Sequence, residues 1–341
     1  MIRRILLLLC ILGFSSPAFA QTWSTVSLAT KDLAYSPLTQ RLYATTPANN
    51  SVQEIDPFTG TLLRSLLFAG GQPNKLAVSD TGSHLYVGLD GAGQVARINL
   101  ATFTVDLQFP LGTDSFFGPF LPRDIAVQPG NPNVLAVVRS NAGITGTRGV
   151  AIFDSGVMRP TVTTDVYTVT QLEFSSTPSR LYGYDDETTG YEFSRLTVDA
   201  AGVTRNDSVG SLIQGFNTQI RFDAGRIYGS DGRVIDPEPR LLLGTFDLAG
   251  AYRTLVAPNA AGGAAYFITQ AFGSSTPVVL RRFDPSTFLQ VDEDALTGVL
   301  APISNNPFSS LVSFGSDGLA FRTESNQLVL IRTGISGIPP P

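Results

Sequence analysis

The chain has 341 residues, of which 43% are apolar and 15% charged, and its formal net charge at pH 7 is −5. This apolar content excludes a disordered or collagen-like chain, and the acidic balance argues against nucleic acid or an anionic membrane as the main partner. One cysteine and one histidine exclude a disulfide framework and nearly every Cys/His metal site, so we expect no metal and no cofactor.

Residues 1–20 have the organisation of a secretory signal peptide. Arg3 and Arg4 form a short basic region, residues 5–14 carry no charge, and Ala18-Phe19-Ala20 supplies the small residues of a cleavage site. The apolar run is shorter than the roughly 20 residues that a membrane-spanning helix needs, and no later segment is apolar enough to span a bilayer. We therefore expect a secreted or periplasmic protein without a membrane span.

A short apolar segment, usually containing a tyrosine, recurs along the rest of the chain at intervals of roughly 46 residues. Its seven copies are Leu42-Tyr43-Ala44, Leu85-Tyr86-Val87, Leu135-Ala136-Val137, Leu181-Tyr182-Gly183, Ile227-Tyr228-Gly229, Ala265-Tyr266-Phe267 and Leu319-Ala320-Phe321. Another apolar strand lies shortly before each copy, with turn residues such as Asp223-Ala224-Gly225 between the two. Third strands that end in Asp or Asn, and fourth strands at 61–68, 104–111 and 241–248, extend several repeats.

Seven repeats of four short antiparallel strands, separated by Gly- and Pro-containing turns, predict an all-β, seven-bladed β-propeller. The last repeat lacks a fourth strand, and residues 23–28 form a spare strand ahead of the first repeat. Pairing of this N-terminal strand into the last blade would close the ring and remove an exposed sheet edge. We expect a monomeric propeller at 21–333, followed by an extended Pro-rich tail at 334–341. The strand tyrosines recur at one place in each blade, which predicts packing between blades rather than sugar stacking.

The second repeat carries a resemblance to a known family. Its segment KLAVSDTGSHLYV, which begins at Lys75, and QVARIN, which begins at Gln94, resemble the bacterial YVTN-type (WD40-like) β-propeller repeat. Gly88-Leu89 stands where that repeat ends its Tyr-Val strand with an asparagine. The resemblance is good over 32–112 and only patterned beyond. It implies the propeller fold but no single activity, because related propellers include secreted proteins without a known reaction, lactonases and amine dehydrogenase subunits.

Polar residues stand immediately before each predicted inner strand, where a propeller lines the mouth of its central channel. The candidate ligand-binding residues of this mouth are Lys31, Asp32, Asn74, Lys75, Arg123, Asp124, Gln171 and Gln219, with Arg139 and Arg148 in the third blade. The basic members of the set would hold a small carboxylate or phosphate by charge-assisted hydrogen bonds. The sequence favours a different interpretation, in which these acids and bases neutralise one another around a water-filled funnel.

The remaining candidates for a metal site or a catalytic base are an acidic run and a single histidine. Asp185-Asp186-Glu187 is the densest acidic run, and we expect a solvated loop tip there, with a Ca²⁺ site as the alternative. His84 precedes an apolar strand, and a polar turn residue is expected, because the chain contains no GxSxG nucleophile elbow. The sequence therefore predicts no set of catalytic residues.

Insertions at 112–122 and 141–149 lengthen blades 2 and 3 on one face of the propeller. Phe116, Phe117 and Phe120 in the first insertion are candidates either for a partner contact or for a plug in the channel mouth. We expect a non-enzymatic binding scaffold for a protein or a surface ligand. The alternative is a periplasmic enzyme, lactonase-like or dehydrogenase-subunit-like, that uses the polar channel mouth.

Overall fold

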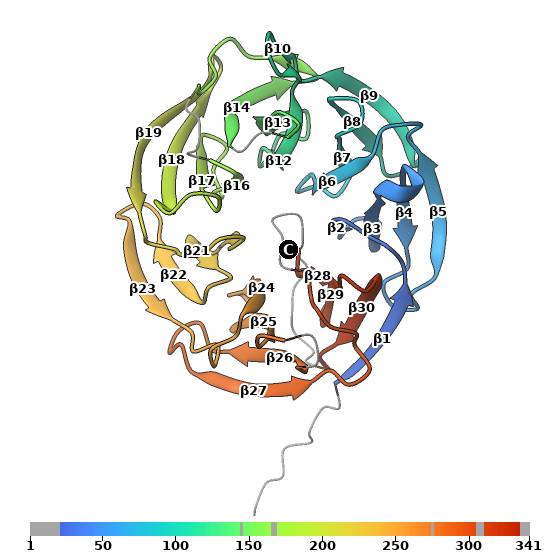
Figure 1. Cartoon of the computed structure of the whole chain (residues 1–341), viewed down its shortest axis with the longest axis vertical. Helices are drawn as coiled ribbons and strands as arrows, with labels where there is room; N and C mark the ends of the chain where they lie inside the picture. Colours follow the sequence, from blue (N-terminus) through green and yellow to red (C-terminus); the bar gives the residue numbers. More distant parts are fainter. Residues whose placement is uncertain (1–20, 144–145, 165–168, 274–275, 305–309, 335–341) are drawn as a thin grey trace, which may run out of the picture.

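The computed structural model describes residues 21–143, 146–164, 169–273, 276–304 and 310–334. The signal peptide expected at 1–20 and the tail expected at 334–341, apart from its first residue, lie outside the described residues. In the described part of the chain, seven four-stranded antiparallel sheets, here called blades, stand in a ring around a common axis (Figure 1). The predicted all-β, seven-bladed propeller is confirmed.

Each of the first six blades is formed by consecutive strands, ordered from the axis outward, because short turns join antiparallel neighbours. Blade 1 contains β2 (Leu33–Ser36), β3 (Arg41–Thr46), β4 (Ser51–Ile55) and β5 (Leu62–Leu67). Blade 2 contains β6 (Pro73–Val78), β7 (His84–Leu89), β8 (Gln94–Asn99) and β9 (Thr104–Pro110). Blade 3 contains β12 (Leu121–Val127), β13 (Val134–Ser140), β14 (Thr147–Asp154) and β15 (Val157–Met158).

The second half of the ring follows the same order. Blade 4 contains β16 (Gln171–Phe174), β17 (Arg180–Tyr184), β18 (Glu192–Asp199) and β19 (Gly202–Gly210). Blade 5 contains β20 (Ile220–Asp223), β21 (Arg226–Gly229), β22 (Arg233–Asp236) and β23 (Leu241–Thr245). Blade 6 contains β24 (Arg253–Asn259), β25 (Ala264–Gln270), β26 (Val278–Phe283) and β27 (Gln290–Ala295).

Blade 7 joins the two ends of the described chain. It contains β28 (Val312–Phe314), β29 (Gly318–Arg322), β30 (Gln327–Arg332) and, as its outermost strand, β1 (Thr22–Ser27). β1 pairs antiparallel with β30, with Trp23 opposite Ile331, and the Trp23 indole N–H donates to the Thr297 carbonyl at 2.9 Å. The predicted closure by the N-terminal strand is confirmed, and it leaves β30 without a free edge.

The core lies between blades rather than inside them. Each of the seven neighbouring blade pairs encloses its own cluster of buried apolar side chains. Side chains alternate along β3, so Leu42 packs towards blade 7 and Tyr43 towards blade 2. Interblade packing is confirmed for the strand tyrosines, which are buried at the interfaces at positions Tyr43, Tyr86, Tyr182, Tyr228 and Tyr266.

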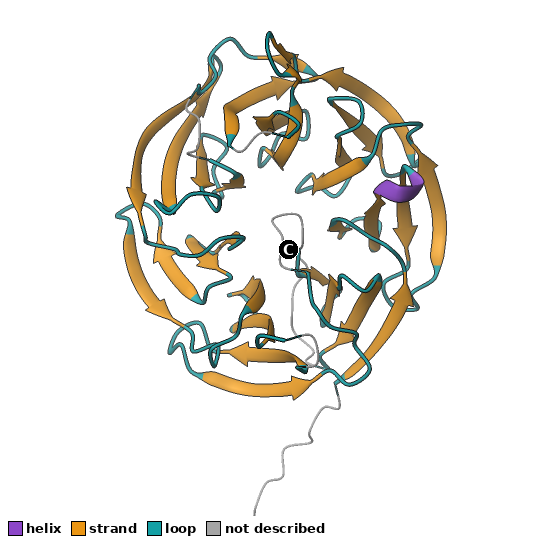
Figure 2. Ribbon diagram, in the orientation of Figure 1, coloured by secondary structure: helices purple, strands orange, loops and turns teal. Residues whose placement is uncertain are grey.

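The ring has two different faces. Every inner strand begins on the same face, which also carries the connections from second to third strands, and we call it the loop face. The opposite face carries the turns from first to second strands, and we call it the turn face. Figure 2 shows that helix is confined to one short segment of the described chain, the 3-10 turn η1 (Pro47–Asn49). No helix among the described residues has the length and apolar character to cross a membrane.

The insertion between blades 2 and 3 contains regular secondary structure. It forms a small hairpin of β10 (Thr113–Asp114) and β11 (Gly118–Pro119), which we call the blade 2–3 hairpin. One oxygen of Asp114 accepts the backbone N–H groups of Phe116 and Phe117 at 2.8 and 3.1 Å. Gly118 closes the turn with a φ of 80°, a conformation that few other residues adopt.

Candidate functional site

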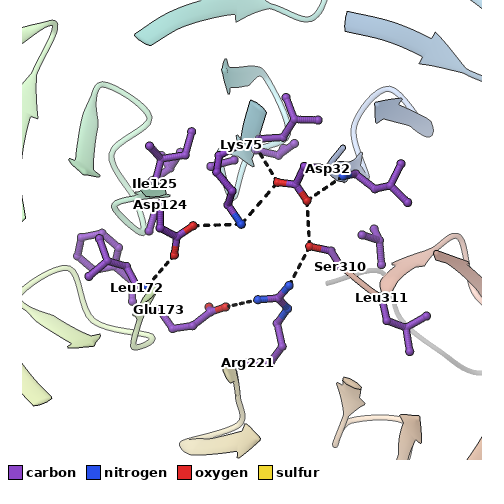
Figure 3. Close-up of a pocket in the computed structure, with 17 residues that line it drawn as sticks. Asp32, Lys75, Asp124, Ile125, Leu172, Glu173, Arg221, Ser310 and Leu311 are labelled. Atoms are coloured by element: carbon purple, nitrogen blue, oxygen red, sulfur yellow. Dashed lines mark hydrogen bonds and ion pairs between the residues drawn. The ribbon is translucent and has the colours of Figure 1, made fainter. Parts of the chain in front are cut away.

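Six polar side chains form a nearly closed circuit around the channel axis, here called the channel ring (Figure 3). Its members are Asp32, Lys75, Asp124, Glu173, Arg221 and Ser310. Lys75 lies between two acids of the neighbouring blades: its Nζ is 3.6 Å from Asp32 Oδ2 and 3.1 Å from Asp124 Oδ1. These three residues were predicted at the channel mouth, and the structure brings them together. The circuit lines a cavity of about 360 Å³.

The other half of the channel ring continues the circuit. Ser310 Oγ lies 3.1 Å from Asp32 Oδ1 and accepts from Arg221 Nη2 at 2.9 Å, while Arg221 Nη1 is 3.1 Å from Glu173 Oε1 (Figure 3). Sequence reasoning missed Glu173 and Arg221. A signal was present, because the equivalent inner-strand positions of the first three blades hold alanine, at Ala34, Ala77 and Ala126.

Two acids of the channel ring also form a hydrogen bond with the inner strand of the next blade. Asp32 Oδ2 accepts the backbone N–H of Leu76 at 3.0 Å, and Asp124 Oδ2 accepts that of Leu172 at 2.7 Å. Gln171 repeats the contact one blade further, where its amide oxygen accepts from Ile220 N–H at 3.3 Å. The carboxylates therefore satisfy inner-strand donors and balance Lys75 at the same time.

The positive charges of the channel ring are compensated by its own carboxylates. Burial opposes ionisation of Lys75, but Asp124 and Asp32 outweigh it, so the pKa of Lys75 lies above its ordinary value. Burial raises the pKa of Glu173, and Arg221 opposes that rise. With three carboxylates against two cations, the ring offers no excess of positive charge to an anionic ligand.

A second tier of polar and charged side chains lies closer to the loop face than the channel ring, and two of them, Asn74 and Arg123, directly precede its members Lys75 and Asp124. Asn74 Nδ2 donates to Asp90 Oδ2 at 2.8 Å, and burial raises the pKa of Asp90 to about 6, against the influence of Asn74 and Lys31. Arg123 Nη2 lies 2.6 Å from Glu187 Oε1, so this predicted mouth residue is paired with an acid of blade 4.

The acidic run of blade 4 is not a solvated loop tip, and that prediction is wrong for two of its three members. Asp185 and Asp186 are buried, whereas Glu187 is only partly buried. Asp185 accepts the Glu187 backbone N–H at 2.9 Å, and Asp186 accepts from the Thr170 hydroxyl. Burial raises the pKa of Asp186 to about 6. The described residues contain no group of three or more His, Cys, Asp or Glu side chains that could hold a metal ion.

Lys31 and Arg322 bring two further cations to the mouth. Arg322 ends β29, is 7% exposed, and its Nε has no hydrogen-bond partner among the described residues. Burial lowers the pKa of Lys31, and the positive charge of Arg322 lowers it further. Burial also lowers the pKa of Arg322, which Asp32 and Glu324 only partly counter.

Arg139 and Arg148 support the blade 2–3 hairpin instead of joining the channel ring. The Arg139 guanidinium carbon lies 4.7 Å from the centre of the Phe120 ring, and that of Arg148 lies 5.1 Å from the centre of the Phe117 ring. Arg139 also donates to the Arg148 carbonyl at 3.2 Å. Phe116, at the tip, is 90% exposed, so the hairpin presents an aromatic ring on a braced base.

Two other predicted residues, Gln219 and His84, make contacts within the blades. Gln219 is buried, and its backbone N–H donates to the Ser230 hydroxyl at 3.0 Å. His84 begins β7 rather than occupying a turn, with Nδ1 2.8 Å from Ser83 Oγ and Nε2 3.6 Å from Asp106. Burial and the charge of Arg97 lower the pKa of His84.

Comparison with known proteins supports the fold. No protein-family model and no curated protein matches the chain. The β-propeller domain of Cps50 (Swd1) from Myceliophteria thermophila is similar, with a TM-score of 0.66 and 13% identity over 91% of this chain and 98% of that one. Hydrazine synthase from Kuenenia stuttgartiensis is similar as well, with a TM-score of 0.65 and 14% identity over 90% and 96% of the two chains. At these identities the likeness establishes the seven-bladed β-propeller fold.

Proposed function

We propose that this propeller is a non-catalytic scaffold that binds a partner protein through its loop face, chiefly through the blade 2–3 hairpin. The observation that carries the proposal is the pairing of an exposed Phe116 with a base braced by Arg139 and Arg148. Aromatic and arginine side chains on a preorganised support are the residues that dominate protein–protein binding energy. The YVTN-type repeat and a secreted or periplasmic location, inferred from residues 1–20, belong to the same proposal.

The state of the channel also favours binding over catalysis. A general base needs a side chain that is free to take a proton at a substrate, but the acids and bases of the channel ring contact one another. Hydrolysis of lactones by the purified protein, with or without divalent cations, would contradict the proposal and favour the lactonase-like alternative.

The partner experiment compares three proteins. Immobilised wild type, a Phe116→Ala/Phe117→Ala variant and a Phe216→Ala/Tyr252→Ala variant are exposed to an extract of the source organism. Proteins captured by the wild type are then purified and titrated calorimetrically. We expect the first variant to lose at least about tenfold in affinity. The second variant, altered on the same face but at blades 5 and 6, should bind like the wild type. Equal binding by all three proteins would overturn the proposal.

A small anion at the channel mouth is a second candidate, and Arg322 favours it. Arg322 and Lys31 bring two largely buried positive charges to the mouth that disfavour each other, and a carboxylate or phosphate beside them would offset both. Phosphate or citrate at constant ionic strength should raise the melting temperature of the wild type but not that of an Arg322→Gln variant. The same shift in both proteins would contradict the site.

A further inference from the structure

A separate pocket of about 360 Å³ opens on the loop face between blades 5 and 6. Blades 3, 4 and 5 separate it from the blade 2–3 hairpin along the shorter arc of the ring (Figure 1). Its wall on one side is the segment from Gly215 to Thr218, which leads into β20. Its wall on the other side is Gly250 to Tyr252, which leads into β24. Nothing in the proposed hairpin contact requires this pocket.

Exposed aromatic rings flank the pocket on both sides. Phe216 packs edge-to-face with Tyr191 at a centroid distance of 5.3 Å, and Tyr252 does the same with Phe272 at 5.1 Å. Phe216 is 54% exposed, Tyr252 61% and Phe272 79%. The contacts within each pair restrain the rings while leaving much of their surface in water. Grouped exposed aromatic surface of this kind marks binding sites on soluble proteins.

The floor of the pocket is polar but carries no spare charge. Two neutral polar side chains also line the pocket: Asn217, which is exposed in the first wall, and Thr254, the second residue of β24. The Asp231 carboxylate is already engaged, since it accepts the backbone N–H groups of Gln214 at 2.8 Å and Arg233 at 3.1 Å. No lysine or arginine of the described chain lines the pocket. It therefore offers a neutral amide and a neutral hydroxyl between aromatic rings.

We propose that this pocket binds a neutral saccharide. A pyranose ring has apolar C–H faces that pack on aromatic rings, and hydroxyl groups around its edge that both donate and accept hydrogen bonds. The first property matches Phe216 and Tyr252, and the second matches Asn217 and Thr254. A phosphate or carboxylate ligand would lack a cation here. A wholly apolar ligand would leave the amide and the hydroxyl unpaired.

The test uses the folded propeller and a panel of oligosaccharides of two to six neutral hexose or N-acetylhexosamine units, titrated calorimetrically. We expect at least one member to bind the wild type with a Kd below about 1 mM. Tyr252→Ala and Phe216→Ala should each weaken that binding about tenfold or more, whereas Tyr252→Phe should retain most of it. Phe116→Ala/Phe117→Ala is the matched control and should bind the saccharide like the wild type.

Two outcomes would overturn the saccharide site. They are a panel without a binder and binding that survives both alanine substitutions. Unchanged melting temperatures of the variants exclude unfolding as the cause of a loss. Because the partner protein is tested with the hairpin variant and the saccharide with the pocket variants, failure of one proposal leaves the other measurable.

Discussion

Cationic side chains make different contacts in the channel ring and on the blade 2–3 hairpin. In the channel ring Lys75 lies between two carboxylates from neighbouring blades, within 3.6 Å of both. On the hairpin Arg139 and Arg148 stack on phenylalanine rings and leave Phe116 exposed to water. In the channel the cations hold blades together, whereas on the hairpin they hold a surface in place. The channel ring therefore joins blades through buried ion pairs, whereas the hairpin, which we propose as the recognition surface, leaves an aromatic ring in water.

The largest effect is expected from Lys75→Met. Removing the cation leaves Asp32 and Asp124 buried without the ammonium that lies between them, which should lower the free energy of unfolding by about 3 to 5 kcal/mol. Urea titration of the purified variant measures the loss.

The matched control for Lys75→Met also changes the two acids, by Asp32→Asn and Asp124→Asn. An asparagine at each position would keep an oxygen for the backbone N–H groups of the next blades but carry no charge, so the triple variant should recover most of the lost stability. A Lys75→Met variant as stable as the wild type would show that the pairing in the ring is not needed.

Gly149→Ala should have the next largest effect, because this glycine of β14 lies directly against the backbone of Thr163. Its φ is 78°, and an added Cβ would lie 1.7 Å from the Thr163 carbonyl oxygen. We expect a loss of about 2 to 4 kcal/mol in unfolding free energy. Gly130→Ala is the matched control: it has a φ of 74° with open space around the Cβ, so it should lose only about 1 kcal/mol. Equal losses would show that the close approach at Gly149 is unimportant.

The tier above the channel ring predicts an unusual dependence on pH. The pKa of Asp90 is raised from 3.8 to about 6, so between these values the folded chain holds a proton that the unfolded chain has released. The contribution of Asp90 to stability therefore falls as the pH rises from about 4 to 6.

Asp90→Asn tests this dependence by removing the buried charge. At pH 7.5 the variant should be more stable than the wild type by about 1 to 3 kcal/mol, and at pH 4.5 the difference should largely disappear. Thermal melts at both pH values measure it. A difference that does not change with pH would refute the role of the carboxylate.

The smallest effect on stability is expected at the blade 2–3 hairpin, where we expect the largest effect on partner binding. Phe116→Ala/Phe117→Ala removes an exposed ring and a half-exposed one, together with one cation–π contact, so unfolding free energy should change by about 1 kcal/mol or less. Calorimetric melting measures this change. A loss comparable to that of Lys75→Met would make the hairpin a structural element rather than a recognition surface.

Much of the fold was predictable because each of the seven repeats carries the same pattern of interface-forming residues. Leu42 and Tyr43 show how one strand serves two interfaces, and the same pair of roles recurs in every blade. The spare N-terminal strand was predictable from a missing fourth strand in the last repeat. Position relative to the inner strands also predicted that Asp32, Lys75 and Asp124 would meet.

What the sequence did not predict depends on contacts between separate segments of the chain. Asp186 is buried because Thr170 and Arg123 approach it from other segments, and nothing in the run Asp185-Asp186-Glu187 carries that information. Likewise, Phe216 and Tyr252 belong to different connections, and only the closed ring places both beside one pocket. Residues that differ from the repeat, such as Glu173 among alanines, were the available signal.

Site-specific photo-crosslinking tests the central claim most directly. A photoreactive p-benzoylphenylalanine replaces either Phe116 on the loop face or Leu38, which is 65% exposed in a turn on the turn face. Both proteins are irradiated with the partner captured by the wild type. We expect a covalent adduct from position 116 and none from position 38. An adduct from position 38, with none from position 116, would contradict it.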